Sequence, residues 1–239
     1  MNTLLSYFED TYKFEDHAII EANGKDENGS FLILNKTIFY PQGGGQPSDR
    51  GTLEVGSVVI PIHKVKSVEN EIRHYTDREY NQFVGQKVKC SVDQETRLLH
   101  ARLHTSGHLI SNVIEQNYPC WRGVKGHHFP DECYVEFSSK NSQLENITLE
   151  FVNKEIEKFI EADCLINVDQ VASQNLKEMC PNLAYSIPGD QPIRVMRIGD
   201  FPFSPCGGTH IKSLKELKGL EITKCKVKNK IMKINYHIN

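Results

Sequence analysis

Two short stretches far apart in the sequence contain side chains that suit a metal ion. One holds His104 and His108, the other holds Cys206 and His210, and the members of each pair are four residues apart. Imidazole nitrogens and a cysteine thiolate are donors that zinc prefers, and four of them complete its usual set of ligands. Either pair alone is more often a coincidence, whereas both together predict one zinc site.

The first pair lies in a segment with a helical pattern, residues 95–116. Apolar residues recur there three, four or seven positions apart, and Asp93 is suited to cap the first turn. Residues four apart share one face of a helix, so His104 and His108 can point at one ion. His100 continues this stripe one turn earlier, so the helix alone leaves open which two histidines bind.

The second pair lies in a segment that disfavours a helix. Pro205 precedes Cys206, and Gly207 and Gly208 separate Cys206 from His210. Proline and glycine are the poorest residues for a helix interior. We therefore expect a tight loop that turns a thiolate and an imidazole toward one point.

A glycine-rich segment, residues 40–49, contains Gly43, Gly44 and Gly45 followed by Gln46. It is not a phosphate-binding P-loop, because no Gly-Lys-Ser/Thr follows and no helix begins there. Two interpretations stay open: a tight turn between strands, or a backbone that approaches a ligand closely while Gln46 offers its amide. For Asp49 and Arg50 just after it we expect a local turn pair, with contact to substrate as the alternative.

The composition is typical of soluble globular proteins. The chain has 239 residues, of which 38% are hydrophobic and 25% charged, with a net charge of −3. No apolar run approaches the roughly 20 residues that span a bilayer, and the first ten residues lack the basic region of a signal peptide. Seven scattered cysteines favour a reducing compartment. These features predict a cytoplasmic protein.

Basic side chains gather near the C-terminus. Residues 212–233 contain eight Lys and two Glu, a local balance of +6. Within this stretch Lys224, Lys226 and Lys228 alternate with other residues, and a period of two places them on one face of a strand. Two interpretations remain: an edge strand that resists aggregation, or a row that contacts nucleic-acid phosphates.

The elements that position these residues fall into two predicted domains. Residues 1–92 predict a small β-barrel domain that carries the glycine-rich segment, with turns at Asn23-Gly24 and near Asn28. Residues 93–239 predict an α+β domain with helices on a largely antiparallel sheet. Beyond the histidine helix we expect the following elements: strands at 18–21, 31–34, 37–40, 58–62, 88–92, 133–137, 165–171 and 192–198, helices from 148 and at 176–179, and a hairpin of 220–228 with 231–238.

Three motifs resemble parts of one known family. His104-Thr-Ser-Gly-His108, and Ile198-Gly-Asp-Phe201 followed by Cys206-Gly-Gly-Thr-His210, resemble the editing domain of alanyl-tRNA synthetase. The glycine-rich segment resembles the stretch that precedes that domain. With all three motifs in order over roughly residues 30–230, and no aminoacylation domain, the chain is similar to free-standing alanyl-tRNA editing proteins, the AlaX family in its medium-length type.

The resemblance implies an enzyme, a zinc-dependent aminoacyl-tRNA deacylase. Its reaction would be hydrolysis of the ester between the 3′-terminal ribose of tRNA(Ala) and a wrong amino acid, Ser first and Gly second. It implies one Zn²⁺ per chain, the acceptor end of mischarged tRNA as partner, no membrane and no nucleotide cofactor. We expect a monomer or a weak homodimer.

The resemblance also assigns roles to single residues. Gln46 and Thr105 are the expected catalytic residues, and either Thr105 or Thr209 is expected to orient a ligand imidazole. For His127 and His128 the alternative is a pair of exposed loop histidines. The expected substrate-binding and tRNA-binding residues are Gly44, Gly45, Lys125, His127, His128, Lys224, Lys226 and Lys228.

Two other functions compete with this prediction. One is a zinc hydrolase that acts on another ester, and the other is a non-catalytic RNA-binding module stabilised by zinc. Four protein ligands usually close a structural site, whereas catalytic zinc usually keeps an open position. Asp200 is the candidate for a carboxylate base, with a capping role as the alternative. A metal at the floor of an open pocket would favour an enzyme, and a sealed metal would favour the module.

Overall fold

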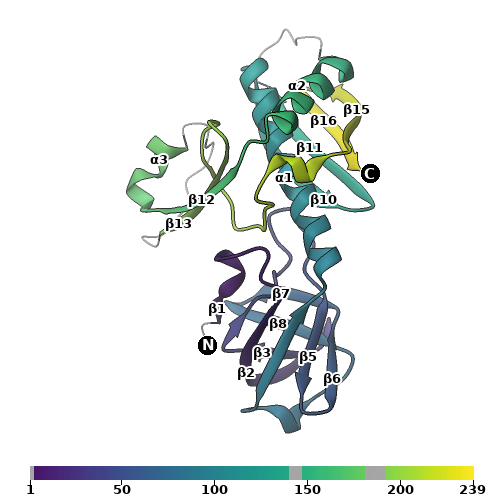
Figure 1. The fold of residues 1–239 in the computed structure, drawn as a ribbon, viewed down its shortest axis with the longest axis vertical. Coiled ribbons are helices and arrows are strands. Elements are labelled where there is room, and N and C mark those ends of the chain that lie inside the picture. The colour runs from purple at the N-terminus through teal and green to yellow at the C-terminus, as the bar shows by residue number, and fades with distance from the viewer. Residues whose placement is uncertain (1–2, 140–146, 181–182, 184–191) are drawn as a thin grey trace. The chain divides into compact units, whose positions relative to one another are not determined.

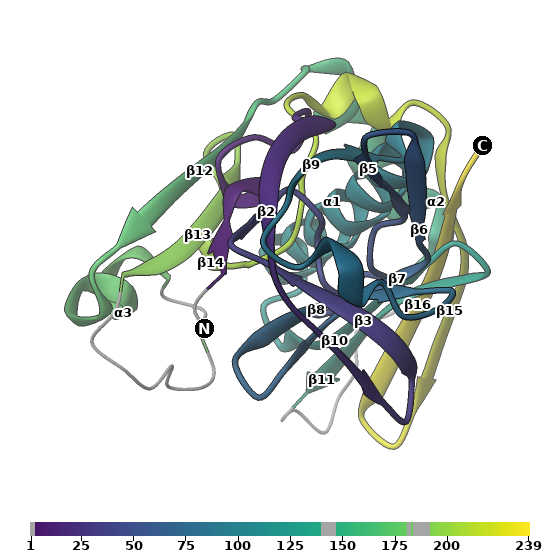
Figure 2. The same cartoon turned by 90° about the horizontal axis from the view of Figure 1, so that it is seen from below.

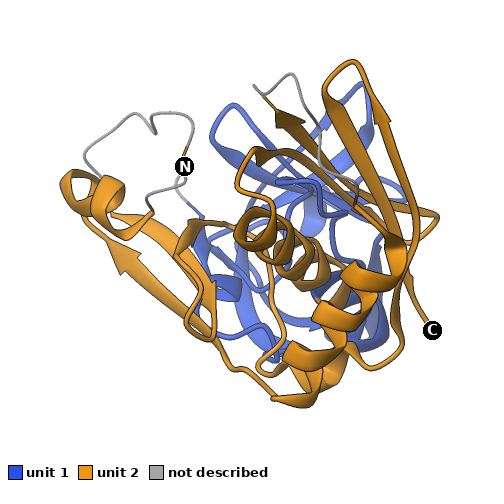
Figure 3. Ribbon diagram, turned by 90° about the horizontal axis from the view of Figure 1, so that it is seen from above, with its two compact units in different colours: residues 1–101 blue, residues 102–239 orange. Residues whose placement is uncertain are grey.

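The structure, a computed structural model, describes residues 3–139, 147–180, 183 and 192–239. The chain divides into two compact units, residues 1–101 and residues 102–239 (Figure 3). The division falls inside helix α1 (Gln94–Asn117), which begins close to the predicted change of period at residue 93. None of the helices in the described part is long and apolar enough to cross a membrane.

Unit 1 is built on a seven-stranded sheet in the order β6-β5-β9-β2-β3-β8-β7 (Figure 1). Every neighbouring pair in it is antiparallel. Two short strands, β1 (Leu4–Leu5) and β4 (Lys36–Thr37), pair beside it in parallel. The seven strands are β2 (Glu15–Asp26), β3 (Gly29–Leu34), β5 (Gly51–Val55), β6 (Val58–Ile62), β7 (Lys64–Val68), β8 (Glu71–Thr76) and β9 (Lys87–Val92).

The predicted barrel is not found. Within the described residues no ladder joins the edge strands β6 and β7, so the sheet stays open. His63 is the only residue between these two strands. A hairpin needs a loop of at least two residues. The chain instead turns a corner at His63, whose N–H donates to the carbonyl of Tyr75 at 3.2 Å, and continues along β8.

Two local predictions in unit 1 were wrong. The strand expected at 37–40 is confined to β4, and the turn expected at Asn23-Gly24 lies inside β2. Gly24 is there for packing, because a Cβ at this position would come within 2.5 Å of the Phe31 ring. The turn follows Asp26, whose carboxylate accepts a hydrogen bond from the N–H of Asn28 at 2.7 Å.

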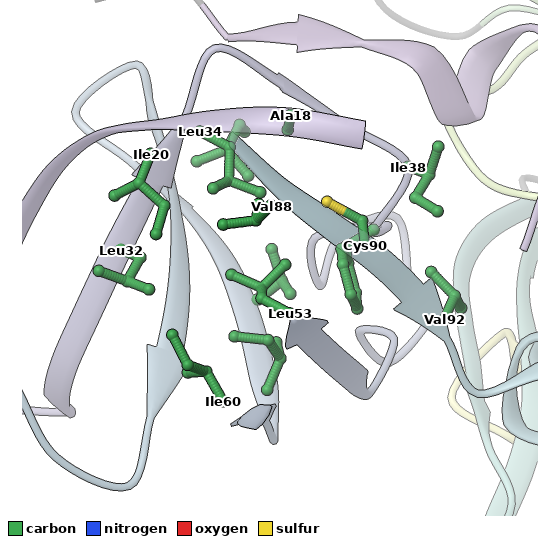
Figure 4. Close-up of a cluster of buried hydrophobic side chains, with 14 of the residues drawn as sticks. Ala18, Ile20, Leu32, Leu34, Ile38, Leu53, Ile60, Val88, Cys90 and Val92 are labelled. Atoms are coloured by element: carbon green, nitrogen blue, oxygen red, sulfur yellow. The ribbon is translucent and has the colours of Figure 1, made fainter. Parts of the chain in front are cut away.

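The core of unit 1 is a cluster of inward-facing side chains with strand periodicity (Figure 4). Along β2, Ala18 and Ile20 are buried while their immediate neighbours are exposed, as expected for a sheet with one face toward the core. On β9 the inward positions are Val88, Cys90 and Val92. The strands predicted at 18–21, 31–34, 58–62 and 88–92 are therefore confirmed.

Unit 2 combines helices with two antiparallel sheets (Figures 1 and 2). One sheet has the strand order β10-β11-β16-β15 and the other β12-β13-β14. The mixed α+β prediction is confirmed for the described residues. The elements besides α1 are β10 (Trp121–Phe129), β11 (Glu132–Ser139), α2 (Leu149–Glu161), β12 (Ile166–Val171), α3 (Leu176–Met179), β13 (Ile193–Ile198), β14 (Ser204–Pro205), β15 (Leu220–Lys228) and β16 (Ile231–Ile238).

Local chemistry sets several boundaries in unit 2 as predicted. The C-terminal hairpin turns at Asn229 and Lys230, whose φ angles of 50° and 61° are those of a tight hairpin turn. Helix α2 begins after Thr148, whose hydroxyl accepts from the N–H of Phe151. Strand β10 was missed, because Gly123 and Gly126 interrupt its alternation.

A buried ion pair fixes the start of α1 in unit 1. Asp93 caps the helix, as predicted, by accepting from the N–H of Thr96 at 2.8 Å. One turn on, Arg97 reaches Asp49, and both side chains are fully buried. The expected pairing of Asp49 with Arg50 is therefore wrong.

Hydrogen bonds saturate both partners of this pair. The Arg97 guanidinium also donates to the carbonyls of Thr11 at 2.9 Å and Ile38 at 2.5 Å. The Asp49 carboxylate accepts from the N–H of Tyr40 at 2.6 Å. A buried pair is tolerated when its remaining donors and acceptors are satisfied in this way. The pair thus ties the glycine-rich segment to α1.

Replacing Arg97 by Leu tests this constraint. The Asp49 carboxylate would stay buried without its guanidinium, so the free energy of unfolding should fall by about 3–5 kcal/mol. Urea titration followed by circular dichroism measures the change. Lys13→Ala, which breaks the more exposed pair with Asp16, should cost less than about 1 kcal/mol. Equal, small effects of both substitutions would contradict the proposed role of the pair.

Candidate metal centre

The four predicted ligands meet in unit 2. The donor atoms of His104, His108, Cys206 and His210 all lie within 4.8 Å of one another. The Cys206 Sγ atom is 3.5 Å from His104 Nε2 and 3.2 Å from His210 Nε2. A tetrahedral zinc ion with its usual bond lengths sets a nitrogen-to-sulfur distance of about 3.5 Å. The residues therefore fit a metal ion.

Helix α1 and one loop supply these ligands. His104 and His108 lie on one face of α1 with ring centroids 5.1 Å apart, and His100 is not part of the group. Cys206 and His210 follow β14. Arg194 of β13 holds this loop, since its Nη1 donates to the carbonyls of Cys206 at 2.6 Å and Gly208 at 2.9 Å.

Thr105 lies where it can orient a ligand. Its hydroxyl is 3.1 Å from His210 Nδ1, and it accepts from the N–H of Ile211 at 3.4 Å. The contact occupies Nδ1 and leaves Nε2 of His210 to face the other donors. Partners that occupy the outer nitrogen of a metal-binding imidazole fix its orientation and tautomer.

Burial controls the protonation of the ligands. It lowers the pKa of His108 to about 4 and holds the pKa of His104 and of His210 well below the ordinary value. Nearby positive charge from Arg194 acts in the same direction. Burial raises the pKa of the Cys206 thiol, although the amide of Gly208 and the charge of Arg194 oppose this. At neutral pH the three imidazoles therefore offer lone pairs, and the thiol carries a proton that a metal must displace.

His128 lies beside the cluster, with its ring stacked 4.8 Å from that of His104. Its Nδ1 is 2.6 Å from the hydroxyl of Tyr236, which donates to the carbonyl of Leu103 at 2.9 Å. Nδ1 is therefore the donor toward Tyr236. Burial lowers the pKa of His128 to about 3, so Nε2 is an acceptor at neutral pH.

Two glycines make room for the His128 ring. A Cβ at Gly107 would come within 2.2 Å of it, and a Cβ at Gly126 within 2.4 Å. Any larger residue at either position would therefore displace the imidazole. The Thr-Ser-Gly segment between the two helical ligands thus has a packing requirement of its own.

The cluster is not sealed. His104 and His210 are buried, whereas His108 and Cys206 are only half-buried. Asp200 is exposed in the turn after β13 and lines a cavity of about 390 Å³ together with Asn112 and Phe201. It is not part of the cluster, which contains no carboxylate among the described residues. His108 and Cys206 thus keep some exposure to solvent.

The two histidines that the sequence placed together point to opposite faces of β10. His128 faces the metal cluster, and His127 stacks on Tyr134 with a centroid distance of 5.0 Å. Residues paired directly across strands share a face of the sheet. Lys125, His127, Lys224, Lys226 and Lys228 therefore lie on one outer face, because their registers connect through β11 and β16.

The glycine-rich segment of unit 1 forms a tight turn, the first of its two interpretations. Gly43 and Gln46 exchange backbone hydrogen bonds of 3.2 and 2.8 Å. Gly44 and Gly45 have φ angles of 52° and 78°, which favour glycine. The hydroxyl of Tyr40 donates to the Gly43 carbonyl at 2.8 Å. The Gln46 side chain is fully buried.

Sequence reasoning missed Tyr236 and Arg194. Tyr236 occupies an inward position of β16 with Met232 and Ile234, so its hydroxyl had to find a buried partner. Arg194 is one of two arginines in β13, the strand that leads to the metal loop, and it is half-buried. A polar group at a core position of a predicted strand was the available signal for Tyr236, whereas no local signal distinguishes Arg194 from Arg197.

Comparison with known proteins identifies the family. The family model described as threonyl and alanyl tRNA synthetase second additional domain matches residues 193–233, and that of class II (A) tRNA synthetases matches residues 6–96. Alanyl-tRNA editing protein AlaX-M of Methanosarcina barkeri is 30% identical over 240 residues, covering 94% of this chain and 93% of that protein. The chain belongs to the AlaX-M family of alanyl-tRNA editing proteins.

Other relatives place the AlaX-M chain among longer proteins. AlaX-L of Pyrococcus horikoshii is 30% identical over 227 residues, which cover 94% of this chain and 55% of that protein. The alanine–tRNA ligase of Methanobrevibacter smithii is 29% identical over 226 residues, 89% of this chain and 24% of the ligase. The resemblance inferred from the three motifs is confirmed.

The protonation states predict how this AlaX-M protein binds its metal. At pH 7 the binding of Zn²⁺ should release about one proton, from Cys206, because the imidazoles are already neutral. Calorimetry of the metal-free protein in buffers of different ionisation enthalpy measures this number. Cys206→Ala should bind more weakly and release no proton. Release of two or more protons by the wild type would show that the imidazoles are not neutral.

Proposed function

We propose that this protein hydrolyses the aminoacyl ester of mischarged tRNA(Ala) in trans, as an aminoacyl-tRNA deacylase. The observation that carries this is the match to AlaX-M proteins over 94% of this chain and 93% of the relative. The converged His and Cys donors support it, because they are the metal-binding set that an editing site of this family is expected to have. ATP has no role in the proposed reaction.

Zinc is the metal that this donor set suits best. His104, His108, Cys206 and His210 would hold it, and their mixture of nitrogen and sulfur is typical of zinc sites. When bound, zinc supplies a Lewis acid that polarises a carbonyl or lowers the pKa of a water molecule. Thr105 keeps the His210 ring oriented for this contact.

The substrate would be Ser-tRNA(Ala) first and Gly-tRNA(Ala) second. A synthetic site sized for a methyl group cannot strongly reject an isostere with an added hydroxyl, and discriminates by only about 10²-fold. An editing site that hydrogen-bonds this hydroxyl disfavours Ala, because its own polar groups would stay unpaired at about 1–3 kcal/mol each. Glycine would be admitted by its size.

The remaining predicted residues would bind the substrate. His128 offers an unprotonated Nε2 as an acceptor for the α-amino group or a ribose hydroxyl of the acceptor end. In unit 1, Gly44 and Gly45 would shape the turn that carries Gln46, the proposed catalytic amide. Lys125, His127 and the row Lys224, Lys226 and Lys228 would contact phosphates, which position a nucleic acid without specifying its sequence.

The half-buried ligands disfavour the rival RNA-binding module. A purely structural zinc site has no need of exposure, yet Cys206 and His108 both keep some. A hydrolase for another ester remains the second candidate, because the same cluster would serve it. The identity of the ester substrate separates that candidate from the proposed deacylase.

A deacylation assay tests the proposal. Ser-tRNA(Ala) and Gly-tRNA(Ala) should lose their amino acid about 10²-fold faster than Ala-tRNA(Ala), for the hydrogen-bonding and size reasons given above. Release of labelled amino acid over time is the measurement. Chelation of the metal and the variant His210→Ala should each abolish it. Equal rates for all three substrates, or none above the spontaneous rate, would reject an editing function.

A second prediction concerns Gln46. Loss of one polar group that acts in the transition state costs about 10²-fold in rate, so Gln46→Ala should lower deacylation by that order with unchanged zinc content. The nearby exposed Gln42 gives a matched control, and Gln42→Ala should leave the rate unchanged. Because Gln46 is buried, unfolding curves must show an intact fold. Wild-type activity in the Gln46 variant would mean that the segment is only a turn.

A further inference from the structure

The outer face of the β10-β11-β16-β15 sheet carries an uneven distribution of charge. We call it the basic face. Its residues follow from the strand registers. Five lysines and three acidic side chains lie on it, a surplus of two positive charges: Lys125, Lys224, Lys226, Lys228, Lys233, Glu132, Glu136 and Glu221.

The lysines of β15 have no acidic partner. Lys224 faces Asn235 across the ladder, and Lys228 faces Ile231. Lys226 lies directly opposite Lys233, and like charges in this position are destabilising. Among the residues that the structure describes, no ion pair is formed by Lys224, Lys226 or Lys228. The free protein thus carries a charge arrangement that a bound anion would relieve.

Tyr134 holds two further lysines in place. The Lys233 Nζ lies 3.5 Å from the centroid of its ring, and the Lys125 Nζ lies 5.5 Å from it. An aromatic ring attracts an ammonium group through its quadrupole and leaves the positive charge uncancelled. The ring therefore orders two ammonium groups that stay available to an anion.

One carboxylate on this face competes for Lys233. Glu132 accepts from its Nζ at 2.8 Å, but the glutamate side chain is 57% exposed. Exposed ion pairs of this kind contribute little and are screened by salt. Glu136 lies between Lys125 and Lys233 in the same cross-strand row. Glu132 and Glu136 both lie on β11, and Glu221 of β15 lies 3.7 Å from His237 at the other end of the hairpin. The three lysines of β15 therefore still make the positive surplus greatest along that strand.

We propose that Lys226 and Lys233, with Lys125, form a clamp for the phosphodiester backbone of the tRNA acceptor end, and that Tyr134 is its positioning residue. This inference rests on the proposed function, which supplies the polyanion. Lys226 and Lys233 stand on neighbouring strands with Cβ atoms about 4.5–5.5 Å apart, so both ammonium groups can reach one phosphate. The clamp extends the row of β15 across the sheet.

The two like charges of Lys226 and Lys233 make the proposal testable in the free protein as well as in the complex. Lys226→Gln removes the repulsion, so at low salt it should raise the thermal unfolding midpoint of the free protein. The same variant should bind uncharged tRNA more weakly, with a log–log salt dependence less steep by about one unit per lost phosphate contact. If β15 is only a solvated edge strand, the affinity for tRNA and its salt dependence should both stay unchanged. Lys87→Gln, at an exposed lysine of β9, provides the matched control and should leave affinity and slope unchanged.

Variants of Tyr134 test the positioning role. Tyr134→Leu removes the ring and should raise KM for the aminoacyl-tRNA several-fold while kcat changes little. Tyr134→Phe keeps the ring and should retain the wild-type KM. Equal KM values for the Leu and Phe variants would overturn the role assigned to the ring. Because Tyr134 is 8% exposed, circular dichroism must show that both variants fold.

Binding and hydrolysis separate this inference from the proposed function. Uncharged tRNA measures the clamp without any ester to cleave. Unchanged affinity and salt slope in both Lys226→Gln and the triple Gln variant of Lys224, Lys226 and Lys228 would overturn the clamp. Normal salt-dependent binding by a wild-type protein that hydrolyses no aminoacyl-tRNA would instead leave the clamp standing and reject the deacylase.

Discussion

The convergence of three imidazoles and one thiol in unit 2 constrains the helix, the loop and the strand that surround it. Burial keeps the imidazoles neutral, so each has a nitrogen lone pair. The donor nitrogens lie close to one another and to the Cys206 sulfur. A cation satisfies all four donors at once, whereas the metal-free cluster leaves lone pairs in close proximity. Arg194 and Thr105 hold the loop and the His210 ring in this arrangement. These contacts explain why a loop rich in glycine is nonetheless well defined.

Strand β10 connects this centre with the surface of the sheet. Side chains alternate across a strand, so His128 turns inward to stack on His104 while His127 turns outward to Tyr134. The inner face of the sheet thus packs against the metal cluster, and its outer face carries charged side chains. One strand thereby serves the proposed chemistry and the proposed contact with tRNA phosphates. Gly126 of β10 and Gly107 of α1 make the space that brings the His128 imidazole so close to α1.

Much of the fold could be predicted from local patterns. The helical period, the Asp93 cap, the C-terminal hairpin and four strands of unit 1 are where the sequence places them. Two of the errors share a cause, because glycine is a turn signal in sequence patterns but also occurs inside strands. Gly24 makes room for an aromatic ring and Gly126 for an imidazole, and both lie inside strands. Barrel closure was also beyond local patterns, since it depends on a one-residue corner at His63 between two strands.

The sequence by itself determined that a His pair on a helix and a Cys-His loop could form one metal site, because their residue types and four-residue spacings are chemical and local. It also determined the family, through motifs in a fixed order. Only the tertiary structure decided that His108 rather than His100 belongs to the cluster, since both share one helical stripe. It alone paired Asp49 with Arg97, Tyr236 with His128, and Lys226 with Lys233. Each of these joins distant segments, and strand register and packing, which no local pattern contains, set their contacts.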